Sequence, residues 1–186
     1  MRLAMIAALG VVLAGGAWAL WPGKSTTKHP TYPALDLGEM TPDEAAAQAF
    51  RLAPALLLRV YEAFALNEEE AIYDTLATAA SADALVTLYL ERAGALAQSG
   101  LKGSDQVVHE MRILRLDTTP DGARLYMDAD WQVIGTVGHD EHQHVRGNTY
   151  RADLVVEPTG GAWRISDFAL RSVDRSLAGT MASPEG

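Results

Sequence analysis

The chain has 186 residues, 48% of them hydrophobic, which suffices for one folded domain of ordinary size with some sequence to spare. Its formal net charge is −9, and from Asp36 onward 12 Lys and Arg face 24 Asp and Glu, so that this part carries −12. Such a surface repels phosphate backbones and anionic headgroups, which excludes nucleic-acid binding and docking of the folded part on an anionic lipid surface. The absence of cysteine excludes disulfides, thiolate metal sites, cysteine nucleophiles and lipoprotein anchoring.

Residues 3–21 carry no charge and, as a helix, would be long enough to cross a membrane. One interpretation of residues 1–22 is an uncleaved signal anchor, with Trp18 and Trp21 at the interface. The protein would then be a single-pass inner-membrane protein with its domain on the periplasmic, extracytoplasmic side. The alternative is a signal peptide cleaved at Ala19, which would leave a secreted or periplasmic protein. We favour the anchor, because cleavage would leave an apolar start for the mature chain.

Residues 23–40 are rich in Pro, Gly, Ser and Thr, which predicts a flexible tether of extended or irregular backbone. The folded domain is expected over residues 41–175. Residues 176–186 are predicted to form a disordered tail.

Thr41, Pro42 and Glu44 form a strong helix start, with a capping box and a proline at the first helical position. This first helix is predicted to run to about Leu66 and to be kinked or divided by Pro54. Two further helices are expected, one from Asn67 to about Ala80 and one from Ser81 to Ser99–Gly100.

After Gly103 the apolar period changes from 3.6 to about 2, which predicts four strands. They are expected at residues 106–117, 125–137, 142–156 and 162–171. A bulge near Ser166–Asp167 would reconcile the two apolar parities of the last strand. The expected fold class is therefore α+β, with three N-terminal helices on a bent four-stranded antiparallel sheet, preceded by one transmembrane or signal helix.

This order of elements resembles the NTF2-like superfamily, especially its Tim44-like branch. The resemblance is carried by the segment YEAFALNEEEAIYDTL at residues 61–76, the third helix ending at Gly100, and the closing strand with Ala162-Trp163-Arg164-Ile165. It covers about residues 45–172. It implies a cone whose concave sheet face packs on the helices and often leaves a pocket at the mouth. The superfamily holds both enzymes and non-catalytic modules, so the resemblance does not choose between them.

Three of the five histidines, His139, His142 and His144, fall within six residues at the second hairpin of the sheet, with two carboxylates between them. Imidazole and carboxylate ligands would suit Zn, Cu or Ni. His109 on the first strand could add a ligand, because it shares parity with Met111 and Ile113. No cofactor is certain, and the alternative is an ordinary solvated turn.

Counting back by two from the apolar face of the third strand places Tyr150, Asn148 and Arg146 on the concave side of the sheet. Polar groups on such a face favour a ligand pocket. Asp128 and Asp130 have the opposite parity and are expected to face solvent, where like charges would oppose a dimer formed across that face. No catalytic motif is present, and no acid is clearly placed inside the cone.

These observations predict a non-catalytic accessory or binding subunit of a membrane-associated complex. It would be held in the membrane by residues 3–21 and contact a protein partner. One alternative is an exported His-rich metal-binding protein that serves a metal transporter or metalloprotein assembly. Another is a small-molecule isomerase or hydrolase that uses the cone pocket.

Overall fold

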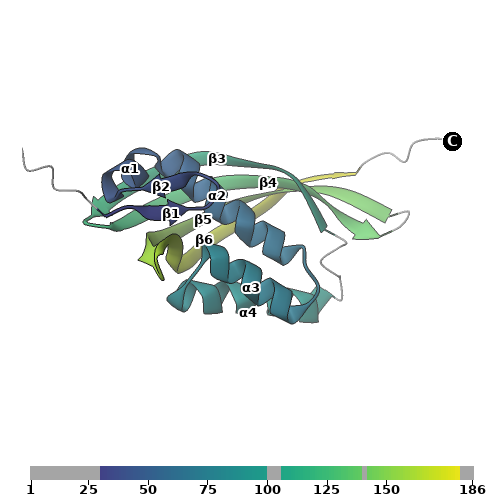
Figure 1. The fold of residues 1–186 in the computed structure, drawn as a ribbon. Helices are drawn as coiled ribbons and strands as arrows, with labels where there is room; N and C mark the ends of the chain where they lie inside the picture. Colours follow the sequence, from purple (N-terminus) through teal and green to yellow (C-terminus); the bar gives the residue numbers. More distant parts are fainter. Residues whose placement is uncertain (1–29, 100–105, 140–141, 181–186) are drawn as a thin grey trace, which may run out of the picture.

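The computed structural model describes residues 30–99, 106–139 and 142–180. A short hairpin comes first, then helices, then one long antiparallel sheet (Figure 1). The elements are β1 (Tyr32–Ala34), β2 (Gly38–Met40), α1 (Pro42–Ala47), α2 (Ala49–Phe64), α3 (Glu69–Ala79), α4 (Ala82–Ser99), β3 (Gln106–Asp121), β4 (Arg124–His139), β5 (His142–Thr159) and β6 (Ala162–Thr180). The predicted α+β class, with helices packed against a four-stranded antiparallel sheet, is confirmed.

The first helix begins where its local chemistry directs, whereas α2 and α3 begin without a side-chain cap. Thr41 accepts a hydrogen bond from the Glu44 amide while the Glu44 carboxylate accepts from the Thr41 amide, which confirms the capping box. The predicted division at Pro54 is absent, because α2 continues through this residue; the chain instead leaves the helix at Gln48, between α1 and α2. The α4 helix ends at Ser99, as expected.

The four strands of the sheet follow one another in the order β3-β4-β5-β6, each antiparallel to its neighbour. Alternate residues of β4 and β5 are buried against the helices. These core positions include Leu125, Met127, Ala129, Trp131, Val133, Ala152, Leu154 and Val156. In β6 the register shifts between Ile165 and Asp167, so Ser166 is the extra residue of a bulge, as predicted. One face of the sheet therefore forms the core with α2, α3 and α4.

Residues 32–40, which the composition assigned to the tether, form the β1–β2 hairpin. Ala34 and Met40 are 3% and 2% exposed, so the hairpin belongs to the core. The Trp163 indole donates a hydrogen bond of 3.2 Å to the Met40 carbonyl oxygen, and the ring of Tyr32 meets the same indole edge-on. At the other end of the chain, β6 continues to Thr180, into the segment predicted as a tail.

The sheet face turned away from the helices carries ion pairs that cross the strands. Asp130 accepts hydrogen bonds from Arg151 of β5 at 2.8 and 2.9 Å. Arg115 of β3 pairs with Asp128 and Asp130 of β4. Asp128 and Asp130 do face away from the core, as expected. Arginines from neighbouring strands pair with both carboxylates, which weakens the charge argument against a second copy on this face; the monomer stays a prediction.

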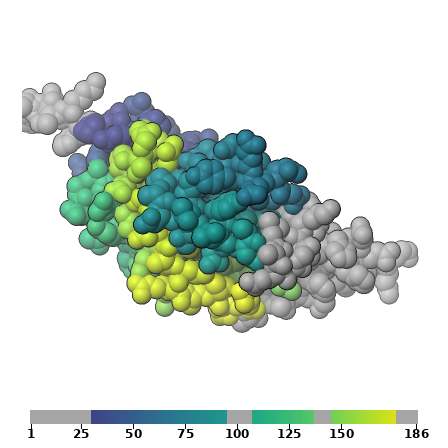
Figure 2. All heavy atoms as spheres, turned by 90° about the horizontal axis from the view of Figure 1, so that it is seen from below, coloured from purple at the N-terminus to yellow at the C-terminus, as the bar shows by residue number. Residues whose placement is uncertain are grey.

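The α3 and α4 helices lie beside β6 on one side of the molecule (Figure 2). In the part of the chain that the structure describes, no helix has both the length and the apolar character needed to cross a membrane. The predicted membrane segment, residues 3–21, lies outside the described residues.

Candidate functional site

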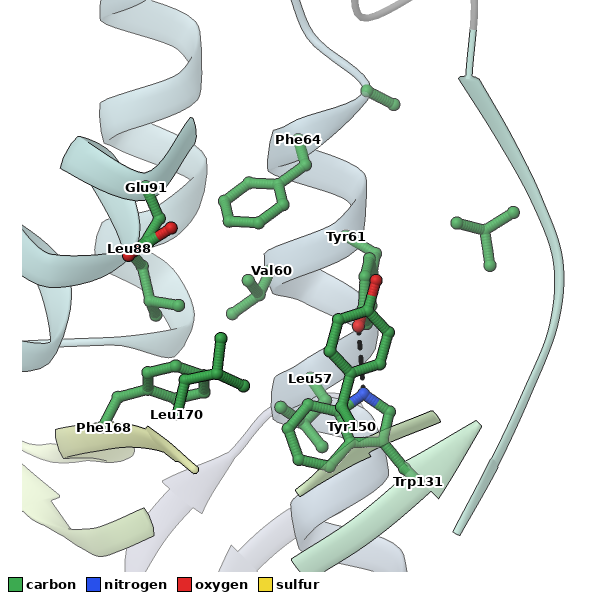
Figure 3. Close-up of a pocket in the computed structure, with 12 residues that line it drawn as sticks. Leu57, Val60, Tyr61, Phe64, Leu88, Glu91, Trp131, Tyr150, Phe168 and Leu170 are labelled. Carbon is green, nitrogen blue, oxygen red and sulfur yellow. Dashed lines mark hydrogen bonds between the residues drawn. The ribbon is translucent and has the colours of Figure 1, made fainter. Parts of the chain in front are cut away.

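A cavity of about 210 Å³ lies between α2, α4 and the core-facing side of the sheet (Figure 3). The helices contribute one wall and all four long strands contribute the other. Its lining is Leu57, Val60, Tyr61, Phe64, Ala65, Leu88, Glu91, Val108, Trp131, Tyr150, Phe168 and Leu170. Leu170 and Val108 are 43% and 39% exposed, so apolar side chains continue from the cavity to the surface. The site is therefore an apolar pocket open at one side.

Three aromatic residues set the polar character of this pocket. The Trp131 indole donates a hydrogen bond of 3.0 Å to the hydroxyl oxygen of Tyr61, as the dashed line in Figure 3 shows. The rings of Trp131 and Tyr150 are stacked, with centroids 5.4 Å apart and planes 16° apart. Asn148 donates a hydrogen bond of 3.1 Å to the Tyr150 hydroxyl. One phenol thus lies in each wall of the pocket, Tyr61 on the helix side and Tyr150 on the strand side, and each has a fixed neighbour.

The Tyr61 phenol stays neutral at physiological pH. Burial raises the pKa of Tyr61 far above its usual range, and the neighbouring Tyr150 raises it further. The carboxylate in the lining is that of Glu91, which comes from an exposed position on α4. The pocket interior is thus uncharged, with an acidic group at its helix wall. Such a surface favours apolar groups inside and a positive charge near Glu91.

A buried arginine supports the helix that forms the pocket wall. Arg92 is 3% exposed, and its Nη2 donates a hydrogen bond of 3.3 Å to the carbonyl oxygen of Leu66, just beyond α2. A cation there complements the partial negative charge at the C-terminal end of α2. Burial lowers the pKa of the Arg92 guanidinium. The end of α2 that carries Phe64 and Ala65 is therefore fixed from α4.

Of the three predicted pocket residues, Tyr150 alone is in the lining of this pocket. Tyr150 lines it, and Asn148 holds the Tyr150 hydroxyl. Arg146 lies farther along β5, opposite Gly135 in register, and its side chain is exposed. The parity argument thus placed one residue of the strand wall, Tyr150, on the correct face. The wall from α2 and α4 could not be read from the sequence, because it depends on which helix residues face the sheet at this point.

The structure places the predicted metal ligands only in part. Register pairs His139 with His142 and Val137 with His144, but the side chains of these histidines lie outside the described part. The metal site there stays a prediction. Among residues 30–99, 106–139 and 142–180, no three His, Asp or Glu side chains of described position gather into a group that could hold a metal.

His109 does not share a face with Met111 and Ile113, as its parity had suggested. The register shifts between Val108 and Glu110, so His109 is the extra residue of a bulge. Its Nε2 lies 3.1 Å from the Thr136 hydroxyl in a hydrogen bond. Thr136 has the parity of Asp128 and Asp130, opposite to that of the pocket residue Trp131.

No family model matches the chain, and no curated protein matches it. Among solved structures, the chain is similar to the crystal structure of the intermembrane space region of chloroplast protein ARC6. The identity is 18% and the TM-score 0.46, over 64% of this chain and 94% of that one. At this level, the likeness says nothing about an activity or a partner of this chain.

Proposed function

We propose that the protein is a membrane-tethered, extracytoplasmic binding subunit of a membrane-associated protein complex and has no catalytic activity of its own. The observation that carries this proposal is the open apolar pocket, in which Trp131 and Asn148 hold the hydroxyl groups of Tyr61 and Tyr150. Fixed hydroxyl groups among apolar side chains suit recognition of a group, and these two phenols do not form a pair of an acid and a base for proton transfer.

The size of the pocket supports a protein partner. A cavity of 150 Å³ accommodates benzene, and sites for drug-sized ligands usually measure about 300–1,000 Å³. At about 210 Å³, this pocket matches one apolar side chain inserted by another protein. Fully buried anchor side chains of this kind carry much of the binding energy at protein interfaces.

The sequence before the domain supports the membrane location. Residues 3–21 are uncharged and of membrane-spanning length, and the part from Asp36 onward carries −12. An acidic domain is repelled by anionic headgroups, so its contacts are with protein. The order of helices and sheet, with a pocket between them, supports the NTF2-like resemblance. The Tim44-like branch rests on the sequence pattern alone.

Filling the pocket tests the proposal. In Ala65→Trp, the indole would occupy the cavity from its edge at the end of α2. Leu58→Trp is the matched control, because Leu58 lies on the same helix, is 42% exposed and does not line the pocket. The tagged full chain is extracted from its native membrane in detergent and its co-purifying chains are identified.

The wild type and Leu58→Trp should retain the same partner. The amount of partner that co-purifies with Ala65→Trp should be lower by at least about tenfold, equivalent to 1.4 kcal/mol in binding free energy. Equal retention by all three would contradict the use of the pocket. Turnover of a small molecule by the purified chain, abolished in Ala65→Trp, would favour the enzyme alternative instead.

A further inference from the structure

We infer that the β1–β2 end of the domain is the end nearest the membrane. The pocket is then held away from the membrane and binds an extramembrane part of the partner. This inference rests on the proposed membrane tether and adds to it an orientation and a class of contact. It follows from where the folded part of the chain begins and from the length of the sheet.

The folded part begins earlier than the composition suggests. Tyr32 already packs against Trp163, and Ala34 is 3% exposed. Only residues 22–29 therefore separate the apolar segment from the start of the described chain. Eight residues span at most about 28 Å, whatever their conformation. The end of the domain that carries the β1–β2 hairpin is thus confined to the membrane vicinity.

The sheet extends from that end over a longer distance. Tyr32 and Asp121 line one surface recess, so the β3–β4 turn lies at the tethered end. Figure 1 shows the β1–β2 hairpin at one end of the long strands and the far ends of β4 and β5 at the other. From Arg124 to Thr136, β4 advances 12 residues, or about 40 Å. The pocket residue Trp131 is seven residues along this path, about 23 Å from the turn.

This geometry restricts the partner. A transmembrane helix or a segment lying at the headgroups would meet the tethered end first, which carries Asp36, Glu39 and Asp121. The pocket instead faces a soluble domain or a long loop that rises from the membrane. A basic residue next to the inserted side chain would complement Glu91 at the pocket.

Fluorescence energy transfer to the bilayer tests the orientation. The chain has no cysteine, so one introduced cysteine is the only labelling site. Asp121→Cys and Val107→Cys are a matched pair, because both are exposed positions near opposite ends of β3. The full chain is reconstituted in phosphatidylcholine vesicles that contain an acceptor-labelled lipid. A second form of each variant carries 20 Gly/Ser residues inserted between His29 and Pro30.

Transfer should be several-fold greater from position 121 than from position 107. The insertion should lower it at position 121, because a flexible chain lengthened from 8 to 28 residues increases its root-mean-square span from about 16 to about 29 Å. Equal or reversed transfer in protein that floats with the vesicles would overturn the orientation and leave the membrane tether standing. Failure of the full chain to float with vesicles would overturn the tether, and the orientation with it.

Discussion

The indole N–H of Trp163 donates to the carbonyl oxygen of Met40, 123 residues earlier in the sequence, over 3.2 Å. This bond joins the first strand pair to β6 and makes the hairpin part of the domain. In Trp163→Phe the Met40 carbonyl loses this donor, and the smaller ring leaves a cavity at a fully buried position. We expect a loss of about 1–3 kcal/mol in the free energy of unfolding. Urea denaturation followed by circular dichroism measures it, and a loss below about 0.5 kcal/mol would show that the bond is dispensable.

The Tyr61 hydroxyl is the acceptor for the buried indole of Trp131. Tyr61→Phe leaves that indole N–H without a partner inside the pocket wall, so we expect a loss of about 1–3 kcal/mol in the free energy of unfolding. Tyr126→Phe is the matched control, because its hydroxyl is on a side chain that is 42% exposed and can be replaced by water as a partner for Arg124. That variant should stay within about 0.5 kcal/mol of the wild type. Similar losses in the two variants would contradict a structural role for the Tyr61–Trp131 bond.

Gly135 is required by a close approach of β3. A Cβ atom at this position would lie 2.4 Å from the Val107 carbonyl oxygen, a backbone atom that cannot rotate away. Gly135→Ala should therefore destabilise the domain by about 1–3 kcal/mol. Gly94→Ala is the opposite case, because Gly94 lies within α4 with open space around its Cβ position, and it should stabilise by up to about 1 kcal/mol. Thermal unfolding of both variants measures whether each substitution raises or lowers stability. A stabilised Gly135→Ala would contradict the close approach of β3.

Ion pairs on the outer sheet face make the free energy of unfolding depend on pH in the acid range. Hydrogen bonds from Arg151, and then from Arg115, hold the pKa of Asp130 below its usual value. Since the folded-state pKa is the lower one, this stabilisation is complete above the unfolded pKa, about 3.9, and is lost as the pH falls through the folded-state pKa. Unfolding free energies measured from pH 7 to pH 2 should therefore decline below about pH 4. Asp130→Asn and Arg151→Gln should both flatten that decline, and an unchanged profile in both would contradict the assignment.

The histidine hairpin remains a separate, testable site. His139, His142 and His144 predict binding of Zn, Cu or Ni by neutral imidazoles, which should weaken steeply below about pH 6. Calorimetric titration of each metal into the wild type and into a triple His→Ala variant measures it. Binding in the wild type that is at least about tenfold tighter would support the site. Equal, weak binding in both would exclude it.

The sequence predicted those features that depend on near neighbours in the chain. The capping box at Thr41–Glu44, the end of α4 at Ser99 and the bulge at Ser166 all follow from local spacing, and all are present. The β1–β2 hairpin could not be predicted, because two prolines and two glycines in residues 23–40 indicate a linker and the stabilising partner, Trp163, is more than 120 residues away.

Register explains the other differences. The parity count placed His109 on the core side, and one extra residue in β3 moved it to the side of Thr136. Asp128 and Asp130 were correctly expected outside the core, but only the pairing of strands shows that Arg115 and Arg151 neutralise them. Parity placed Tyr150 on the pocket side of the sheet, whereas the helix wall of the pocket requires the packing of α2 and α4.

Site-specific photo-crosslinking in intact membranes tests most directly whether the pocket is where a partner binds. A photoreactive amino acid is placed at Leu170, which lines the pocket and is 43% exposed, or at Leu114, which is 52% exposed and does not line it. We predict one discrete protein adduct from position 170 and none from position 114. Adducts of equal yield from both positions, or none from position 170, would contradict the account.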